Sequence, residues 1–268
     1  MKNLKKITLA LTLALAVGLS QSTHAKDSAQ YFRVWQGFKK VELSYPQFIS
    51  ELPLFMRDTV DIYRDRVLNN YLVIVPPENK PDFIPDELAL VALTSKQGYQ
   101  EIRASDEGLR YAERHWDVFE KGVSKSADPM VDYSKDKPKS LLHNQSYDII
   151  GKPIDWTRGY NAVFIGIRKS GLSSDSYLAR LKTHIDLAKT VMLPKGLRGY
   201  IVIANENYEI AYLNWSSKKA HDQAGQSDGG KKVFSDAGTI MDILMYQEAV
   251  PFEAGLEVSP NHAYSTIQ

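Results

Sequence analysis

The 268-residue chain contains no cysteine. This absence excludes disulfide bonds, thiolate metal sites and cysteine nucleophiles together. The sequence also lacks HExxH, paired His-x-His and GxSxG spacings, so neither a metal site nor a serine hydrolase site is predicted. Stability must therefore come from a hydrophobic core, which about 240 residues can supply in one or two domains.

Long apolar runs are also scarce, and the main one lies at the N-terminus. The sequence MKNLKK places three lysines before a predominantly apolar run at residues 7–19, and small residues, Thr23 and Ala25, follow at the −3 and −1 positions. This pattern predicts a secretory signal peptide over residues 1–25, with an uncleaved membrane anchor as the alternative. We expect a periplasmic or secreted protein that has no membrane contact after cleavage.

Neither sign of charge dominates the chain. Lys and Arg number 33 and Asp and Glu number 32, and loss of the three lysines in residues 1–25 leaves 30 against 32. A near-neutral surface gives no electrostatic reason to expect nucleic acid or an anionic membrane as a partner. The predicted partner is a hydrophobic small molecule, and assembly into a homo-oligomer is left open.

The rest of the chain divides into two similar halves. Periodicity and turn residues in the first half predict strands at 31–38, 71–75 and 87–94 and helices at 44–66 and 104–121. In the second half they predict strands at 161–168, 199–204, 209–215 and 243–250 and helices at 173–193 and 218–234. Each half follows the ferredoxin-like order β-α-β-β-α-β, if residues 124–159 carry the last strand of the first half.

These elements predict an α+β fold of two tandem ferredoxin-like units. The expected division is a first domain at 26–135, a linker at 136–158, a second domain at 159–255 and a C-terminal tail at 256–268. Several strands are apolar on both faces, whereas the sheet of a lone ferredoxin-like domain has one solvated face. We therefore expect the two sheets to face each other as an intrachain pseudo-dimeric α/β barrel around an aromatic-lined cavity.

The segment AYLNWSSKKA at residues 211–220 resembles the junction of third strand and helix in dimeric α/β-barrel proteins of the antibiotic-biosynthesis monooxygenase type. The resemblance in element order extends over residues 31–252, although the first half has Leu93-Thr94-Ser95 where the Trp-Ser junction should fall. Members of that family include cofactor-free oxygenases acting on polycyclic phenols, haem-degrading enzymes and proteins without demonstrated activity. The resemblance implies the fold and leaves the function open.

By this resemblance Trp215 and Asn214 line the cavity. A cofactor-free oxygenase must stabilise a substrate anion in a dry pocket while the anion reacts with oxygen. Strand alternation puts Tyr212 and Asn214 on one face and Trp215 on the other, so all three share a cavity only if the strand twists or bulges. A core Trp beneath a helix is the alternative for Trp215.

The first and last strands supply further candidates. Arg33 and Trp35 share a face, opposite the apolar Phe32 and Val34, and we expect them to point into the cavity between the sheets. There Arg33 would bind a carboxylate or phenolate, or alternatively pair with Glu87 or Glu248. Tyr246 shares a face with Glu248 on the last strand.

His115 is the best candidate for a haem ligand, because haem-degrading members of the resembled family take their axial histidine from the same helix. An exposed histidine beside Glu113 and Asp117 is the alternative.

The predicted function is a cofactor-independent oxygenase or isomerase-like enzyme acting on a hydrophobic aromatic or phenolic molecule. The alternative is a periplasmic protein that binds a small ligand, haem included, without chemistry. The predicted catalytic residues are Trp215, Asn214 and Arg33. The predicted ligand-binding residues are Trp35, Tyr212, Tyr246, Glu248 and His115.

Overall fold

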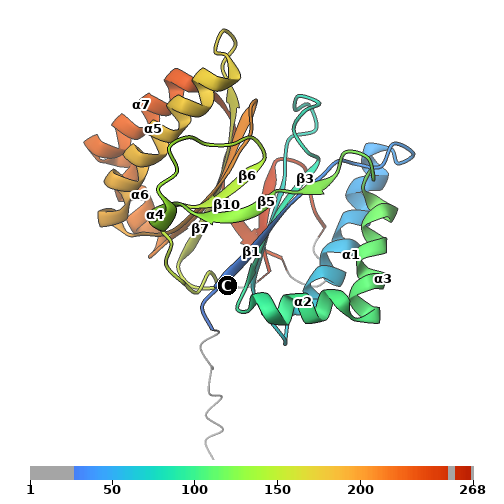
Figure 1. Cartoon of the computed structure of the whole chain (residues 1–268). Coiled ribbons are helices and arrows are strands. Elements are labelled where there is room, and N and C mark those ends of the chain that lie inside the picture. Colours follow the sequence, from blue (N-terminus) through green and yellow to red (C-terminus); the bar gives the residue numbers. More distant parts are fainter. Residues whose placement is uncertain (1–26, 253–256, 267–268) are drawn as a thin grey trace, which may run out of the picture.

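The computed structural model describes residues 27–252 and 257–266, so the predicted signal peptide and its cleavage site lie outside the described residues. Two sets of helices flank a central layer of strands (Figure 1). The first unit consists of β1 (Tyr31–Gly37), α1 (Tyr45–Tyr63), β2 (Leu68–Val75), β3 (Glu87–Leu93), α2 (Lys96–Ala104), α3 (Asp106–Val118), β4 (Lys125–Ser126), β5 (Asp128–Asp132), α4 (Tyr133–Asp136) and β6 (Gln145–Asp148).

The second unit repeats this order, with the single strand β10 where the first unit has β4 and β5 and with no helix that matches α4. It consists of β7 (Tyr160–Arg168), α5 (Ser174–Met192), the 3₁₀ turn η1 (Leu193–Lys195), β8 (Leu197–Ala204), β9 (Tyr208–Trp215), α6 (Lys218–Gln226), α7 (Asp228–Ile240), β10 (Met241–Pro251) and β11 (His262–Ser265). The helices α1 and α5 both have 19 residues, α2 and α6 both have 9, and α3 and α7 both have 13. The predicted α+β fold of two tandem ferredoxin-like units is confirmed. None of the helices in the described part of the chain has the length and hydropathy needed to cross a bilayer.

A serine divides the second helical region of each unit. The Ser105 hydroxyl accepts a hydrogen bond from the backbone N–H of Gly108 and donates one to the carbonyl of Ile102, so it ends α2 and begins α3. Ser227 does the same between α6 and α7. A side-chain oxygen at this position satisfies an N–H that has no partner within the helix. The prediction of one helix at 104–121 is therefore wrong: α2 starts eight residues earlier, at Lys96.

The eleven strands form one sheet in the order β4-β1-β3-β2-β11-β10-β7-β9-β8-β6-β5. The two ends of this order are consecutive in the chain: the N–H of Ala127 donates to Val34 of β1, and that of Asp128 to Asn144, next to β6. The segment 125–132 thus pairs with both units, and the sheet is nearly closed into a barrel, as predicted.

Two short strands complete the ring. β6 follows β5 in the chain and lies between β5 and β8, and β11 follows β10 and lies between β10 and β2. These strands come from the regions expected as linker and tail. Each unit therefore contributes a strand that joins it to the other, and fewer sheet edges stay open.

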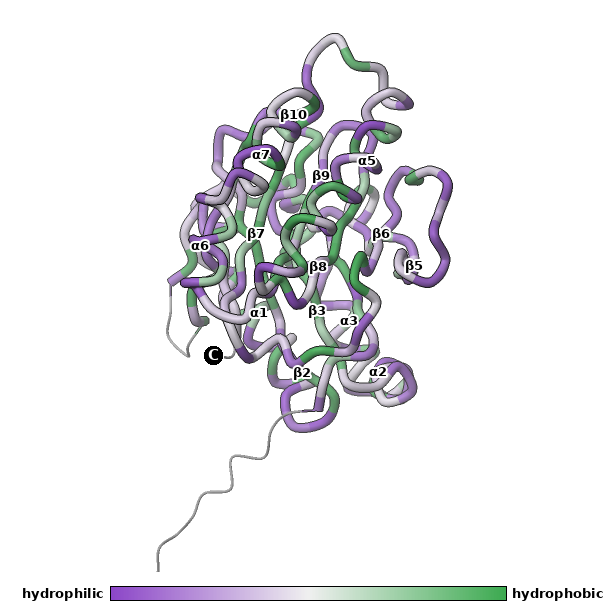
Figure 2. Tube along the Cα trace, turned by 90° about the vertical axis from the view of Figure 1, so that its left-hand side faces the viewer, coloured by the Kyte–Doolittle hydropathy of each residue, from purple (hydrophilic) through white to green (hydrophobic). Residues whose placement is uncertain are grey.

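The inner faces of the sheet meet in a hydrophobic core. It contains alternate residues from both units, among them Val34, Leu90, Ile165, Ile203 and Ile210, all at most 2% exposed. The strands are correspondingly the most hydrophobic part of the chain in Figure 2. The prediction that both faces are buried is confirmed. The predicted position of the cavity, between the two sheets, is wrong because branched apolar side chains fill that space.

A buried hydrogen-bond chain crosses this core. The Tyr208 hydroxyl donates to Oε1 of Gln36 at 2.8 Å, and Nε2 of Gln36 donates to Oδ1 of Asn144 at 2.8 Å. Tyr208 belongs to the second unit and Gln36 to the first, so this chain fixes their register.

Replacing Tyr208→Phe leaves the buried Gln36 carbonyl without its donor, and we expect the free energy of unfolding to fall by about 1–3 kcal/mol. Urea denaturation measures it. Tyr31→Phe is the matched control, because among the described residues the Tyr31 hydroxyl has no hydrogen-bond partner. Equal stability of the two variants would show that the chain of hydrogen bonds contributes nothing.

Candidate functional site

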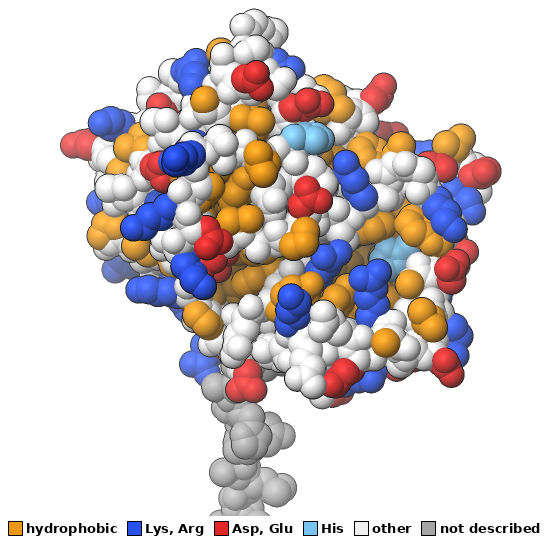
Figure 3. All heavy atoms as spheres, viewed as in Figure 1, with side chains coloured by type: hydrophobic (Ala, Val, Ile, Leu, Met, Phe, Trp, Pro, Cys, Tyr) orange, Lys and Arg blue, Asp and Glu red, His pale blue; other side chains and the backbone are white. Residues whose placement is uncertain are grey.

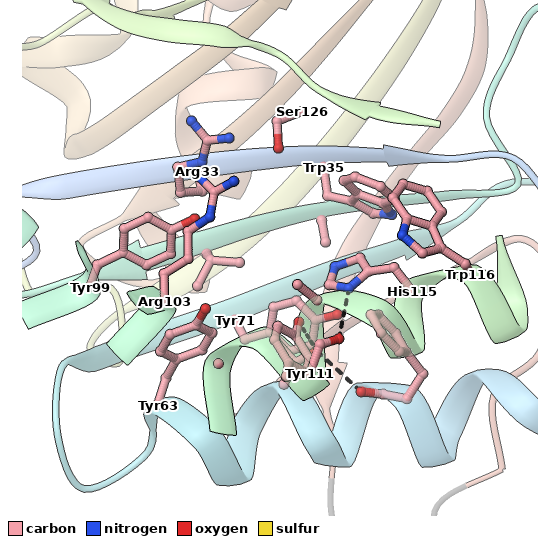
Figure 4. Close-up of a pocket in the computed structure, with 16 residues that line it drawn as sticks. Arg33, Trp35, Tyr63, Tyr71, Tyr99, Arg103, Tyr111, His115, Trp116 and Ser126 are labelled. Atoms are coloured by element: carbon pink, nitrogen blue, oxygen red, sulfur yellow. Dashed lines mark hydrogen bonds between the residues drawn. The ribbon is translucent and has the colours of Figure 1, made fainter. Parts of the chain in front are cut away.

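A cavity of about 180 Å³ lies in the first unit, between the outer face of the sheet and helices α1, α2 and α3 (Figure 4). Its walls are mainly aromatic, with a few polar groups between them. The lining residues are Arg33, Trp35, Phe55, Thr59, Tyr63, Tyr71, Ala89, Val91, Tyr99, Arg103, Gly108, Tyr111, Ala112, His115, Trp116 and Ser126.

Arg33 and Trp35 reach this cavity from β1. They share one face of the strand, as predicted, but the face is the one that meets the helices. The predicted direction is wrong because the space inside the barrel is sealed by both units and takes the more apolar Phe32 and Val34. The helix layer leaves one side open, where a charged group keeps contact with water.

His115 projects from α3 into a ring of aromatic side chains. Its imidazole centroid lies 4.7 Å from Phe55, 4.8 Å from Trp35 and 4.9 Å from Tyr111. Burial lowers the pKa of His115 to about 4, opposed by a backbone hydrogen bond to Tyr111. His115 is therefore half-buried rather than exposed, and its lowered pKa leaves the imidazole neutral at pH 7.

The neutral His115 has a defined orientation. Its Nδ1 lies 3.2 Å from the carbonyl oxygen of Tyr111, which can only accept a hydrogen bond. Nδ1 therefore carries the proton, and Nε2 is left with its lone pair. Within residues 27–252 and 257–266 no group hydrogen-bonds to Nε2, which faces the cavity (Figure 4). A ligand hydroxyl could donate to it.

The floor of the cavity is polar but uncharged. The Tyr71 hydroxyl donates to Oε1 of Glu87 at 3.3 Å, and the hydroxyls of Thr59 and Tyr111 are 2.7 Å apart. Burial raises the pKa of Glu87 to about 8, so this carboxyl holds its proton at neutral pH. Without a negative charge in the floor, the charge of the cavity comes from its arginines.

Arg33 and Arg103 give the cavity a positive end. Arg33 is half-buried and Arg103 is exposed, and across the described part of the chain neither forms a hydrogen bond or an ion pair. The predicted alternative, an ion pair of Arg33 with Glu87 or Glu248, is therefore not formed. Over the face of the molecule seen in Figure 3, Lys and Arg side chains are interspersed with Asp and Glu.

The remaining candidates belong to the second unit. Trp215 and Tyr246 line a separate cavity of about 70 Å³ beneath α5 and α7. Tyr212 and Asn214 lie on the opposite, inner face of β9, as strand alternation predicted, and Glu248 is exposed. The structure does not bring Trp215, Asn214 and Arg33 together.

Hydrogen bonds hold two of these residues, Tyr246 and Asn214, in place. Tyr246 lies with its hydroxyl 2.5 Å from Nε2 of His221. Asn214 is fully buried, and its Nδ2 donates to Oδ1 of Asn161 at 2.8 Å and to the carbonyl of Arg158 at 2.9 Å. Asn214 thereby holds the loop before β7.

The repeat shows why the two cavities differ. The equal helix lengths place Met192, Val233 and Ala237 of the second unit where the first has Tyr63, Tyr111 and His115. The strand register places Phe164 where the first unit has Trp35, because Phe164 pairs with Ala211 as Trp35 pairs with Ala89. Sequence reasoning missed Tyr63, Tyr99, Arg103, Tyr111 and Trp116. Aligning the halves would have shown polar aromatic residues replacing apolar ones on the helix stripes.

Haem does not fit the cavity as formed. About 180 Å³ is close to a cavity of about 150 Å³ that takes one benzene, and haem has four pyrrole rings. His115 has a free nitrogen, as an axial ligand requires, but the side chains of Trp35 and Phe55 pack against the imidazole ring, where the haem would need space. The described residues contain no group of three or more His, Cys, Asp or Glu that could hold a metal ion.

No protein-family model matches the sequence, and no curated protein is significantly similar to it. Solved structures show a likeness. A "putative monooxygenase" from Fusobacterium nucleatum subsp. nucleatum ATCC 25586 is 10% identical with a TM-score of 0.44, over 82% of this chain and 95% of the other. An anthrone oxidase-like protein is 12% identical with a TM-score of 0.35, over 88% of this chain and 97% of the other.

At these identities the likeness concerns the arrangement of elements. The α+β barrel of two ferredoxin-like units expected from the sequence is shown by the strand order and helix positions described above. An activity does not follow from a fold.

The burial of His115 makes stability depend on pH. In the unfolded chain His115 binds a proton below about pH 6.5, whereas in the folded chain it does so only below about pH 4. The free energy of unfolding therefore decreases as the pH falls from 6.5 to 4. We expect wild type to lose about 3 kcal/mol more than His115→Phe between pH 7 and 4. Urea denaturation at several pH values measures this. His262→Ala, at an exposed position, should behave as wild type, and identical pH profiles for wild type and His115→Phe would contradict the buried neutral state.

Proposed function

We propose that the cavity of the first unit binds a single-ring phenolic molecule and oxygenates it without a cofactor. The proposal rests chiefly on one observation: the neutral His115 presents an unoccupied nitrogen to a cavity walled by aromatic side chains. Its volume of about 180 Å³ favours one substituted ring over the polycyclic phenols of the resembled family.

The chemistry assigns a role to each wall. Nε2 of His115 accepts the proton of the phenolic hydroxyl, and the imidazolium so formed pairs with the phenolate. The positive charge of Arg33 and Arg103, at the other end of the cavity, favours an anionic ligand. The low pKa of His115 makes the imidazole a weak base in isolation, so proton transfer depends on the ion pair formed with the phenolate beside it. The phenolate then gives electrons to molecular oxygen.

A hydroquinone can supply all the electrons this reaction needs. One atom of O2 is inserted into a ring C–H bond to give a new hydroxyl. The other atom leaves as water with the two hydrogens lost from the original hydroxyls, so the hydroquinone becomes a hydroxyquinone. The four-electron reduction of oxygen is balanced by hydroxylation of the ring and by oxidation of both hydroxyls to carbonyls. No external reductant is required.

Oxygen consumption with a panel of hydroquinones tests the proposal. We expect one O2 molecule to be consumed per hydroquinone, without release of hydrogen peroxide. In His115→Phe we expect kcat to decrease by about 100-fold or more. His262→Ala should keep the wild-type rate. Oxygen consumption no faster than in buffer, or equal in wild type and His115→Phe, would refute oxygenation. Binding without turnover would instead support the ligand-binding function considered from the sequence.

We further propose that the protein acts outside the cytoplasm, after removal of residues 1–25. The basic and apolar N-terminal sequence supports this. Mass spectrometry of the protein from the periplasmic fraction or medium of a bacterial host should give Lys26 as the first residue. Recovery of full-length protein from the cytoplasm alone would contradict export.

A further inference from the structure

The two arginines of the cavity carry a charge that the protein itself does not neutralise. Arg33 comes from β1 and Arg103 from α2, and both guanidinium groups lie at the end of the cavity away from His115 (Figure 4). Burial raises the pKa of Tyr63, and both Arg103 and Arg33 oppose this effect, which places the two positive charges near one phenol. Two guanidinium groups so placed repel each other and favour an anion between them.

The positive end belongs to the first unit alone. At the positions of Arg33 and Arg103 the second unit has Ala162 and Gly225. The fold therefore does not require cations here. Elsewhere in the described chain, arginines do pair with carboxylates: Arg66, in the turn after α1, pairs with Glu107, and Arg114 of α3 pairs with Asp58.

We propose that the ligand of this cavity is a single-ring hydroxylated aromatic acid. Its carboxylate binds Arg33 and Arg103, its ring packs between the aromatic walls, and its hydroxyl reaches Nε2 of His115. The proposal rests on the proposed function for the location of the site and names the substrate class. Guanidinium groups suit a carboxylate because they can donate two parallel hydrogen bonds.

Binding without oxygen isolates this step from catalysis. The probes are 2,5-dihydroxybenzoate, its methyl ester and hydroquinone, titrated anaerobically by calorimetry. We expect the acid to bind about 10- to 100-fold more tightly than the ester, since hydrogen bonds to charged groups contribute about 1.5–3 kcal/mol. Arg33→Met and Arg103→Met should each weaken binding of the acid and leave that of the ester unchanged.

Arg110→Met is the matched control, because Arg110 is exposed on α3 and does not line the cavity. It should bind the acid as wild type does. Unfolding of the free proteins supplies a second measurement: removing one of two mutually repelling charges should not lower the stability of Arg103→Met. This control separates loss of binding from loss of folding.

The outcomes distinguish the two proposals. Equal affinity for acid and ester, or an Arg33→Met, Arg103→Met double variant that binds the acid as well as wild type, overturns the carboxylate site. Tight, arginine-dependent binding of the acid supports it. If such binding is accompanied by no oxygen consumption, the carboxylate site stands and the proposed oxygenation fails.

Discussion

Burial of both inner sheet faces against each other is the constraint on which the rest of this structure depends. Alternate residues of the strands in both units, such as Val34 and Ile203, enter one core. The sheet then has to curve around that core, and the segment 125–132 and the strands β6 and β11 nearly close it. Only the outer faces remain for the helices, and the cavities lined by Trp35 and by Trp215 both lie between these faces and the helices.

The two units share one arrangement of helices and strands, but different side chains fill the layer between sheet and helices in each unit. Both units keep the capping serines Ser105 and Ser227 and a buried glutamate at the start of the third strand, Glu87 and Glu209, whose pKa burial raises to about 8. These groups belong to the architecture. The difference lies in the layer between sheet and helices: His115 stands where the second unit has Ala237. The second unit packs this layer more closely, and its cavity is about 70 Å³ against about 180 Å³ in the first.

Periodicity was sufficient to predict the two units, the burial of both sheet faces and the shared face of Arg33 and Trp35. It could not determine which face turns inward, because Phe32 and Val34 would suit either the barrel core or the helix layer. That choice depends on contacts with the other unit, far away in sequence. The environment of His115 was equally out of reach, since Phe55 of α1 and Trp35 of β1 bury it. The resemblance at the Trp-Ser junction predicted a site at Trp215 in the second unit, whereas the cavity lined by charged and polar groups lies in the first unit.

The central claim is that the ligand binds beneath the helices of the first unit, and the four tryptophans report on this directly. Trp35 and Trp116 line that cavity, Trp156 lies in the barrel core and Trp215 lines the cavity of the second unit. Anaerobic titration with 2,5-dihydroxybenzoate, followed through the indole N–H signals by NMR, should shift the signals of Trp35 and Trp116 and leave the other two unchanged. Shifts confined to Trp156 or Trp215 would contradict it.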